Sequence, residues 1–171
     1  MPKDMQGEIL YPGNQLKDAY PEQYERSVAR YQGREMVREQ PVPMLGCLWN
    51  DVLYFSPVHP EQVRDALAEL GKEFSVTPWE YFVVDPELIS SKDAVIYMFK
   101  YLDRKDKYKS DNWEPYDPKR VEELTSLPDE TKAYFKRALG EGINPLLWIQ
   151  VPHIMYRGTL DTSGLERIRI S

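Results

Sequence analysis

The stretch CLWNDVLYFSPVHPEQ, residues 47–62, gathers residue types that take part in chemistry in many proteins. It contains the single cysteine of the chain, a tryptophan, an Asn-Asp pair and one of the two histidines. A cysteine thiolate is a nucleophile, and a histidine can change its charge near neutral pH. We do not expect Cys47 to be catalytic, because a buried position in an apolar strand would raise the pKa of its thiol.

The remaining residues of this stretch also have a structural interpretation, which we favour. Asn50 and Asp51 tolerate the positive φ of a tight turn, and apolar residues lie on both sides of them. His59 directly precedes Pro60, so its backbone is extended at the start of a helix. His59, Trp49 and Asp51 are kept as candidate ligand-binding residues.

The second candidate site is VPHIMYRG, residues 151–158. If strand alternation continues past Pro152, then His153, Met155 and Arg157 lie on one face. The arginine could hold a phosphate or carboxylate with its planar fork, and the histidine would add a group that titrates near neutral pH. The alternative, an ion pair with an acidic side chain at an edge strand, is the interpretation that we favour. Any ligand site of this chain is nevertheless expected to include His153 and Arg157 and to recognise an anionic group.

The third candidate is the polar segment of residues 103–116, which has no apolar period and is predicted to be a long loop. Basic residues next to aromatic ones can bind single-stranded nucleic acid by phosphate contacts and stacking. Those in this segment are Arg104, Lys105, Lys107, Lys109, Tyr108, Trp113 and Tyr116. Such a run is usually only solvated, and three aspartates dilute its positive charge, so we do not expect nucleic acid as the partner. A mobile lid over a pocket is a more plausible function for this segment than nucleic-acid binding.

Several large enzyme classes are not supported by the sequence. The patterns GxxxxGK[ST], GxGxxG, HExxH and GxSxG are absent from it. Two histidines and one cysteine, without HxH or HxxxH spacing, form a poor ligand set for zinc, so no metal site is predicted. No motif indicates which cofactor, if any, the protein uses.

Length and composition favour one soluble domain. The chain has 171 residues, of which 42% are hydrophobic, enough for a single core. Its 22 basic and 28 acidic residues give a formal net charge of −6, which disfavours a broad surface for nucleic acid or anionic membranes. With one cysteine and no long apolar run, we expect a cytoplasmic protein that neither spans a membrane nor carries a secretory signal.

Four helices are predicted to position the candidate residues. They cover residues 21–33, 60–70, 118–124 and 126–140. The first two begin with a proline and are followed by a glycine, which suit the first turn and the left-handed exit of a helix. In the last helix, Ser126 and Asp129 have the spacing of a capping box. One apolar stripe of the second helix consists of Val63, Ala66, Leu67 and Leu70.

The predicted strands complete an α+β fold, with a mixed, largely antiparallel sheet and three to four flanking helices in one domain. A hairpin around Asn50-Asp51 would bring Trp49 opposite Val52. A second strand pair is predicted between residues 79–84 and 94–102. Three short strands follow at residues 146–151, 153–158 and 165–170, with Pro152 at an edge or a bend. Residues 1–19 have no apolar period and are predicted to be irregular.

Three stretches, VLYFSPVHPEQVRDAL, YFVVDPELI and YRGTLDTSGLERIRI, resemble the pattern of small bacterial ADP-ribosyltransferase-like domains. The resemblance implies an enzyme that holds NAD between an early strand histidine or arginine and a late catalytic glutamate. No residue of this chain is assigned to either role.

Two hypotheses about function follow from the sequence. The first is a small intracellular binding or interaction domain, with a small anionic ligand or a protein as its partner. The alternative is a small transferase or hydrolase that acts on a nucleotide-type ligand, with His153, Arg157 and His59 lining its pocket. The alternative requires that the two histidines converge on one cleft.

Overall fold

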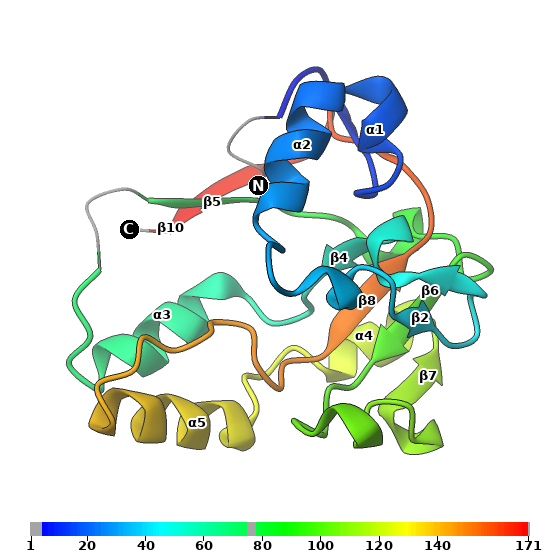
Figure 1. Cartoon of the computed structure of the whole chain (residues 1–171). Helices are drawn as coiled ribbons and strands as arrows, with labels where there is room; N and C mark the ends of the chain where they lie inside the picture. The colour runs from blue at the N-terminus through cyan, green and yellow to red at the C-terminus, as the bar shows by residue number, and fades with distance from the viewer. Residues whose placement is uncertain (1–4, 75–77, 171) are drawn as a thin grey trace.

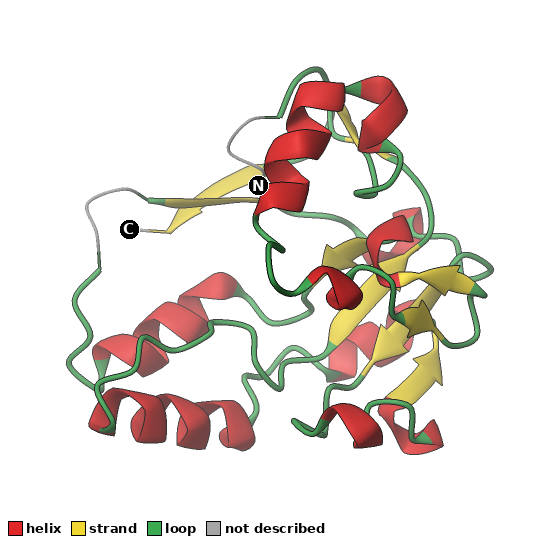
Figure 2. Cartoon of the chain, in the orientation of Figure 1, coloured by secondary structure: helices red, strands yellow, loops and turns green. Residues whose placement is uncertain are grey.

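The structure is a computed structural model, and it describes residues 5–74 and 78–170 of the chain. Five α-helices and ten β-strands lie in these ranges, and the strand pairs found there are all antiparallel (Figure 2). The predicted α+β class is therefore confirmed, in one domain. Within the described ranges, no helix has the length and apolar character needed to cross a membrane.

A four-stranded sheet, which we call the central sheet, joins segments that are far apart in the sequence (Figure 1). Its strands are β4 (Leu53–Phe55), β8 (His153–Tyr156), β6 (Ala94–Tyr97) and β7 (Trp113–Pro115), in the order β4-β8-β6-β7. The edges of the sheet are therefore β4 and β7. All four residues of β6 are buried, because both faces of this inner strand meet an apolar layer.

One face of the sheet packs against a small hairpin. This hairpin consists of β2 (Pro41–Val42) and β3 (Cys47–Leu48), which pair antiparallel. Val42 and Leu45 are buried in a cluster with Tyr97 of β6. The hairpin thus closes the first of two apolar layers.

The opposite face packs against α4 (Pro118–Glu123) and the segment after the short helix η3 (Pro86–Leu88). Val121 of α4 and Ile89 are buried in a cluster with Ile96 of β6. The helix predicted at 118–124 is confirmed, and it begins at Pro118 as the sequence indicates.

Two longer helices form a separate layer beside the sheet, where Figure 1 shows α3 and α5 next to each other. They are α3 (Pro60–Ala68) and α5 (Asp129–Gly140). Val63 and Leu67 of α3 and Phe135 of α5 have no exposed surface and share one cluster. Both helices were predicted, but α5 begins after Pro128 without a side-chain cap, so the expected capping box is not formed.

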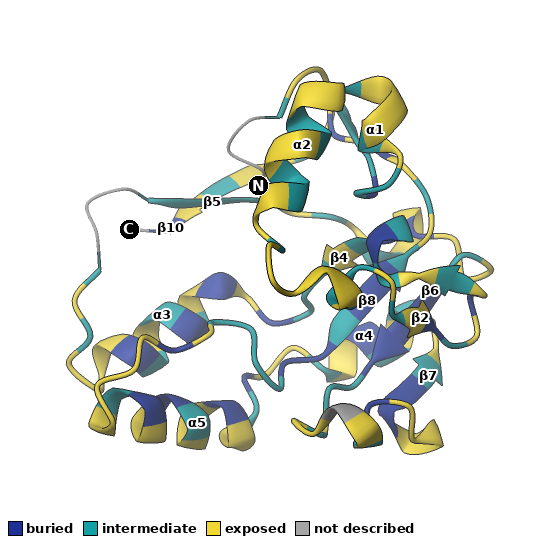
Figure 3. Cartoon of the chain, viewed as in Figure 1, coloured by how far each residue is buried: buried dark blue, intermediate teal, exposed yellow. Residues whose placement is uncertain are grey.

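The N-terminal segment is more regular than predicted. It contains β1 (Ile9–Leu10), which pairs with β9 (Leu160–Asp161), and the short helix α1 (Leu16–Ala19). The predicted amphipathic helix is α2 (Pro21–Ala29), and neither α1 nor α2 buries a residue fully. Figure 3 shows mostly exposed and half-buried residues on both helices.

The predicted hairpin around Asn50-Asp51 is wrong. Residues 49–51 form a turn of 3-10 helix, η2 (Trp49–Asp51), and the apolar runs beside it pair with β2 and β8 rather than with each other. The physical reason is the remote residue Asn14, whose side-chain amide donates to the carboxylate of Asp51 and accepts from the amide of Asn50. These contacts hold the two residues in a compact corner.

The second predicted strand pair is also wrong. Strand β5 (Trp79–Phe82) pairs with β10 (Arg167–Ile170), the last strand, while β6 joins the central sheet. The segment 146–151 forms turns instead of a strand, and Pro152 precedes the inner strand β8 rather than lying at an edge.

The polar segment 103–116 is only partly a loop. It contains two single 3-10 turns, η4 (Arg104–Asp106) and η5 (Ser110–Asn112), and then β7. Asn112 has no exposed surface, and its side chain bonds the backbone of Lys100 and Lys107.

Another short 3-10 helix, η1 (Glu35–Val37), lies between α2 and β2.

The α3–α5 layer gives a first prediction. Leu67→Ala is expected to lower the free energy of unfolding by about 2–5 kcal/mol, because it removes buried methyl groups and leaves a cavity. Leu70→Ala is the matched control, since Leu70 is 39% exposed and should cost much less. Urea denaturation of both variants is the measurement, and equal midpoints would show that this layer is not a packed core.

Candidate functional site

A cavity of about 710 Å³ lies along the free side of β4. Helix α2, the start of α3 and the strands β5 and β10 also contribute to its lining. We call it the α2–β4 cleft and define it by Arg26, Arg30, Tyr54, His59, Tyr81 and Trp148. In the view of Figure 1, α2 lies above β4.

One face of α2, together with Arg30 and Tyr31 directly after it, lines the cleft. The lining residues recur at the spacing of a helix face, and they are Gln23, Arg26, Ser27, Arg30 and Tyr31. Arg26 and Arg30 lie one turn apart, and neither forms an ion pair with a residue in the described ranges. Helix α2 and its C-cap residue Arg30 therefore bring two positive charges to the cleft that form no ion pair within the described part of the chain.

Aromatic side chains form much of the remaining wall. Tyr81 and Trp148 pack edge to face, with 6.1 Å between ring centroids. Burial raises the pKa of Tyr81, and burial with nearby carboxylates raises the pKa of Tyr116 to about 12. These phenols are therefore neutral hydrogen-bond donors, and the wall they form can pack against an apolar or planar group.

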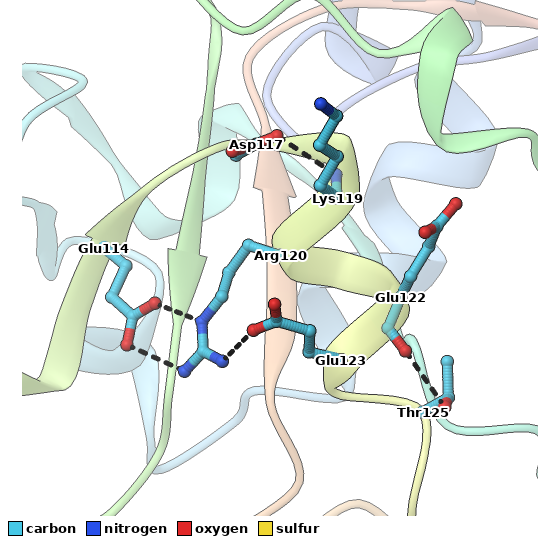
Figure 4. Close-up of polar contacts among 7 residues, drawn as sticks. All are labelled: Glu114, Asp117, Lys119, Arg120, Glu122, Glu123 and Thr125. Atoms are coloured by element: carbon cyan, nitrogen blue, oxygen red, sulfur yellow. Dashed lines mark hydrogen bonds and ion pairs between the residues drawn. The ribbon is translucent and has the colours of Figure 1, made fainter.

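The C-terminal end of α4 adds the one carboxylate found among the described lining residues, that of Glu122. Arg120 fixes this helix, since its guanidinium bonds Glu114 of β7 at 2.8 and 3.3 Å and Glu123 at 2.8 Å (Figure 4). Arg120 also lowers the pKa of Glu114. Thr125, which also lines the cleft, donates to the carbonyl oxygen of Glu122.

His59 lines the cleft at the N-terminus of α3. Its Nδ1 accepts a hydrogen bond of 3.4 Å from the backbone N–H of Glu61, so the ring caps the helix as the structural interpretation expects. The side chain is 48% exposed. His59 is therefore both a helix cap and accessible to a ligand.

His153 also lines the cleft, but its ring packs beside Tyr97 and Phe99, which do not. Burial lowers the pKa of His153 to about 4, so the ring is neutral at pH 7 and does not titrate near neutrality as we expected. Its Nδ1 is 2.6 Å from the carbonyl oxygen of Val151. Because a carbonyl oxygen only accepts, Nδ1 carries the proton and Nε2 is a free acceptor.

Arg157 does not line the cleft. Its guanidinium donates to the carbonyl oxygen of Leu45 at 2.9 Å and to the carboxylate of Asp93 at 3.2 Å. The favoured alternative of an ion pair is thus observed, with an acidic partner 64 residues away in sequence. The predicted combination of His153 and Arg157 is not brought together in this cavity.

Trp49 and Asp51 also lie outside the lining of the cleft. The ammonium group of Lys107 lies 3.2 Å from the centroid of the Trp49 ring, a cation–π contact in the core beside Tyr97. Asp51 accepts from the backbone N–H of Leu48 and from the amide of Asn14. Both residues have structural roles that account for their surroundings.

Cys47 is half-buried, and burial raises the pKa of its thiol, in the direction expected from the sequence. Among the described residues, no group of three or more His, Cys, Asp or Glu side chains is arranged to hold a metal ion.

Sequence reasoning found the two histidines of the cleft but missed Arg26 and Arg30. The available signal was their spacing of four residues on a helix with an apolar stripe. Such a pair is common on solvated helix faces, so its spacing does not show that it faces a cavity.

Comparisons of the chain with protein-family models, with curated proteins and with solved structures find no match. We therefore infer its function from the residues of the α2–β4 cleft and not from its fold. The likeness to ADP-ribosyltransferase-like domains remains a similarity of sequence pattern.

The lowered pKa of His153 predicts a pH dependence of stability. Because the folded pKa lies below the unfolded value, the unfolded chain binds the proton first, and the free energy of unfolding falls as the pH drops from 6.5 toward 4. Between pH 7 and pH 5, His153 should therefore lower the free energy of unfolding by up to about 2 kcal/mol. Urea unfolding of wild type and His153→Phe at both pH values measures it, with His59→Asn as the control that retains the effect. Identical pH dependence of wild type and His153→Phe would contradict the prediction.

The contacts of Arg157 predict a structural role. Arg157→Ala should lower the free energy of unfolding by about 1–2 kcal/mol, since it leaves the carbonyl of Leu45 and the carboxylate of Asp93 without this partner. Arg169→Ala is the matched control, because Arg169 is 74% exposed and pairs only at the surface. If both variants unfold at the wild-type urea midpoint, the Arg157 contacts do not stabilise the fold.

Proposed function

We propose that this protein is a binding domain whose α2–β4 cleft holds an anionic ligand with an apolar or aromatic part. The observation that supports it is the charge of the lining: Arg26 and Arg30 face the cleft, against the single carboxylate of Glu122 among the described lining residues. This local excess of positive charge occurs in a chain whose net charge is −6. Positive side chains beside a low-dielectric wall attract and orient an anion.

The size and wall of the cleft agree with this proposal. Its volume of about 710 Å³ falls in the range of roughly 300–1,000 Å³ that is usual for sites of organic ligands. Two arginines can bind a carboxylate or phosphate through paired hydrogen bonds, and the aromatic wall can cover the rest of the molecule. We propose a cytoplasmic site of action, since the chain has one cysteine and so no internal disulfide.

A transferase or hydrolase acting on a nucleotide-type ligand is the second candidate. It is favoured by the presence of both His59 and His153 in the lining of one cleft. The unprotonated Nε2 of His153 and the exposed ring of His59 are the groups that would accept a proton in such a reaction. Incubation with NAD or nucleoside triphosphates, followed by chromatography of the products, distinguishes this candidate from binding alone.

Binding should depend on α2. Nucleotides, NAD, sugar phosphates and dicarboxylates are screened by thermal shift, and a ligand at about 100 times its Kd should raise Tm by roughly 5 °C or more. Arg26→Ala combined with Arg30→Ala should weaken binding of that ligand by at least about tenfold, since it removes both charge-assisted contacts. Arg137→Ala, on α5 and outside the cleft, is the control. Equal affinities for wild type and the double variant would place the site elsewhere.

A further inference from the structure

The hydrogen-bond pattern of the central sheet shows which backbone groups of β4 are left unpaired. In an antiparallel pair, the N–H and C=O of one residue point to the same side, and the side alternates along the strand. The backbone N–H of Arg157 donates to the carbonyl oxygen of Asp93 at 2.7 Å, on the side of β6. Met155 therefore also bonds toward β6, while its two neighbours Ile154 and Tyr156 bond toward β4.

The same alternation on β4 directs Tyr54 away from the sheet. Phe55 lies opposite Ile154, so Phe55 and Leu53 bond to β8, while the N–H and C=O of Tyr54 point to the free edge. The flanking residues Val52 and Ser56 form no backbone–backbone hydrogen bond with any residue in the described ranges. All five residues line the α2–β4 cleft. The free edge of β4 therefore faces the cleft with unpaired backbone groups.

This free edge has defined ends. At one end, the carbonyl oxygen of Asn50 accepts a hydrogen bond from the backbone N–H of Asn14 at 2.9 Å, so the N-terminal segment occupies the edge next to Asn50. Among the described residues, it forms no such bond with residues 52–56. At the other end, Pro57 has no N–H to offer. An added strand would span residues 52–56, which corresponds to a segment of about five residues, or about 17 Å.

The lining of the cleft comes from both faces of the sheet. Tyr54 lies on the face of Met155, and the pKa of Tyr54 is raised by burial and by the nearby Tyr31, which follows α2. Phe55 and Val121 lie on the other face, in the apolar layer under α4. A ligand in this cleft therefore wraps around a sheet edge, and an extended peptide does so naturally because its side chains alternate between the two faces.

The two arginines add a charge requirement with a matching spacing. Residues four apart on a helix have Cβ atoms about 5–6 Å apart. Side chains two apart on an extended chain repeat at about 6.8 Å on one side. Arg26 and Arg30 can thus meet acidic side chains at alternate positions of a strand that pairs with β4.

We propose that the α2–β4 cleft binds an extended acidic peptide segment, which adds as a strand to the free edge of β4. Alternate carboxylates of the peptide pair with Arg26 and Arg30, and the intervening side chains pack under Phe55 and Val121. The inference rests on the proposed binding function and names its ligand class. A peptide also satisfies the unpaired N–H and C=O of Tyr54, which a small organic anion leaves to water.

The test uses the full chain and the peptide Val-Glu-Val-Glu-Val-amide with an uncharged fluorophore on its N-terminus, and binding is measured by fluorescence anisotropy. The peptide is expected to bind, and its Lys-for-Glu counterpart is expected to bind at least about tenfold more weakly. The Arg26→Ala, Arg30→Ala double variant should lose affinity for the acidic peptide to the same degree, while Arg137→Ala should not. Circular dichroism of each variant confirms that it is folded.

Strand addition is distinguished from simple charge attraction by two N-methylated forms of the acidic peptide. One carries methyl groups on the first, third and fifth backbone nitrogens, and the other on the second and fourth, so the charges are unchanged. Only one form should lose binding, because the backbone N–H groups of every second peptide residue point toward β4 and the others point away from it. The backbone N–H of Tyr54 should also exchange with deuterium at least about tenfold more slowly in the complex.

The outcomes separate the inference from the proposed function. If nucleotides or dicarboxylates bind through Arg26 and Arg30 but the acidic peptide does not, the cleft is an anion site and strand addition is overturned. Equal binding of both N-methylated forms, or unchanged exchange at Tyr54 in the complex, also overturns it. If neither peptides nor small anions bind, the proposed function fails as well.

Discussion

The position of β8 between β4 and β6 is the constraint on which the rest of the structure depends. Its backbone is paired on both sides and its side chains enter two apolar layers, so Met155 is fully buried and Ile154 nearly so. Strand β4 pairs with β8 on one side, and no strand in the described ranges pairs with its other side. The cleft lies on that side, and its location is thus a consequence of strand order.

Charge is distributed unevenly over the molecule. In the polar segment before β7, Lys105 pairs with Asp103 at 3.3 Å and Lys109 pairs with Asp106 at 3.1 Å. On α2, by contrast, Arg26 and Arg30 form no ion pair with a described residue and face a cavity with one carboxylate. A chain with a net charge of −6 therefore has two arginines without an ion pair among the described residues beside the aromatic wall of the cleft. This local charge is the basis of the proposal that the cleft binds an anionic ligand.

The elements that the sequence predicted correctly are those whose hydrogen bonds are local. Helix α3 begins at Pro60 and buries Val63 and Leu67, as the apolar period indicates. The failures are strand pairings. The two apolar runs beside Asn50 looked like a hairpin, but the remote residue Asn14 bonds this corner and each run pairs elsewhere. A turn signal constrains local φ and ψ, and does not select the partner of the strand that follows.

The sequence by itself determined the α+β class, the helices, the acidic net charge and two of the residues that line the cleft, His59 and His153. Helices follow from sequence because each backbone bond closes within four residues. Only the tertiary structure decided that Arg157 pairs with Asp93 and that Arg26 and Arg30 face a cavity. Strand order and the direction of a charged helix face depend on packing between remote segments, and neither leaves a local pattern in the chain.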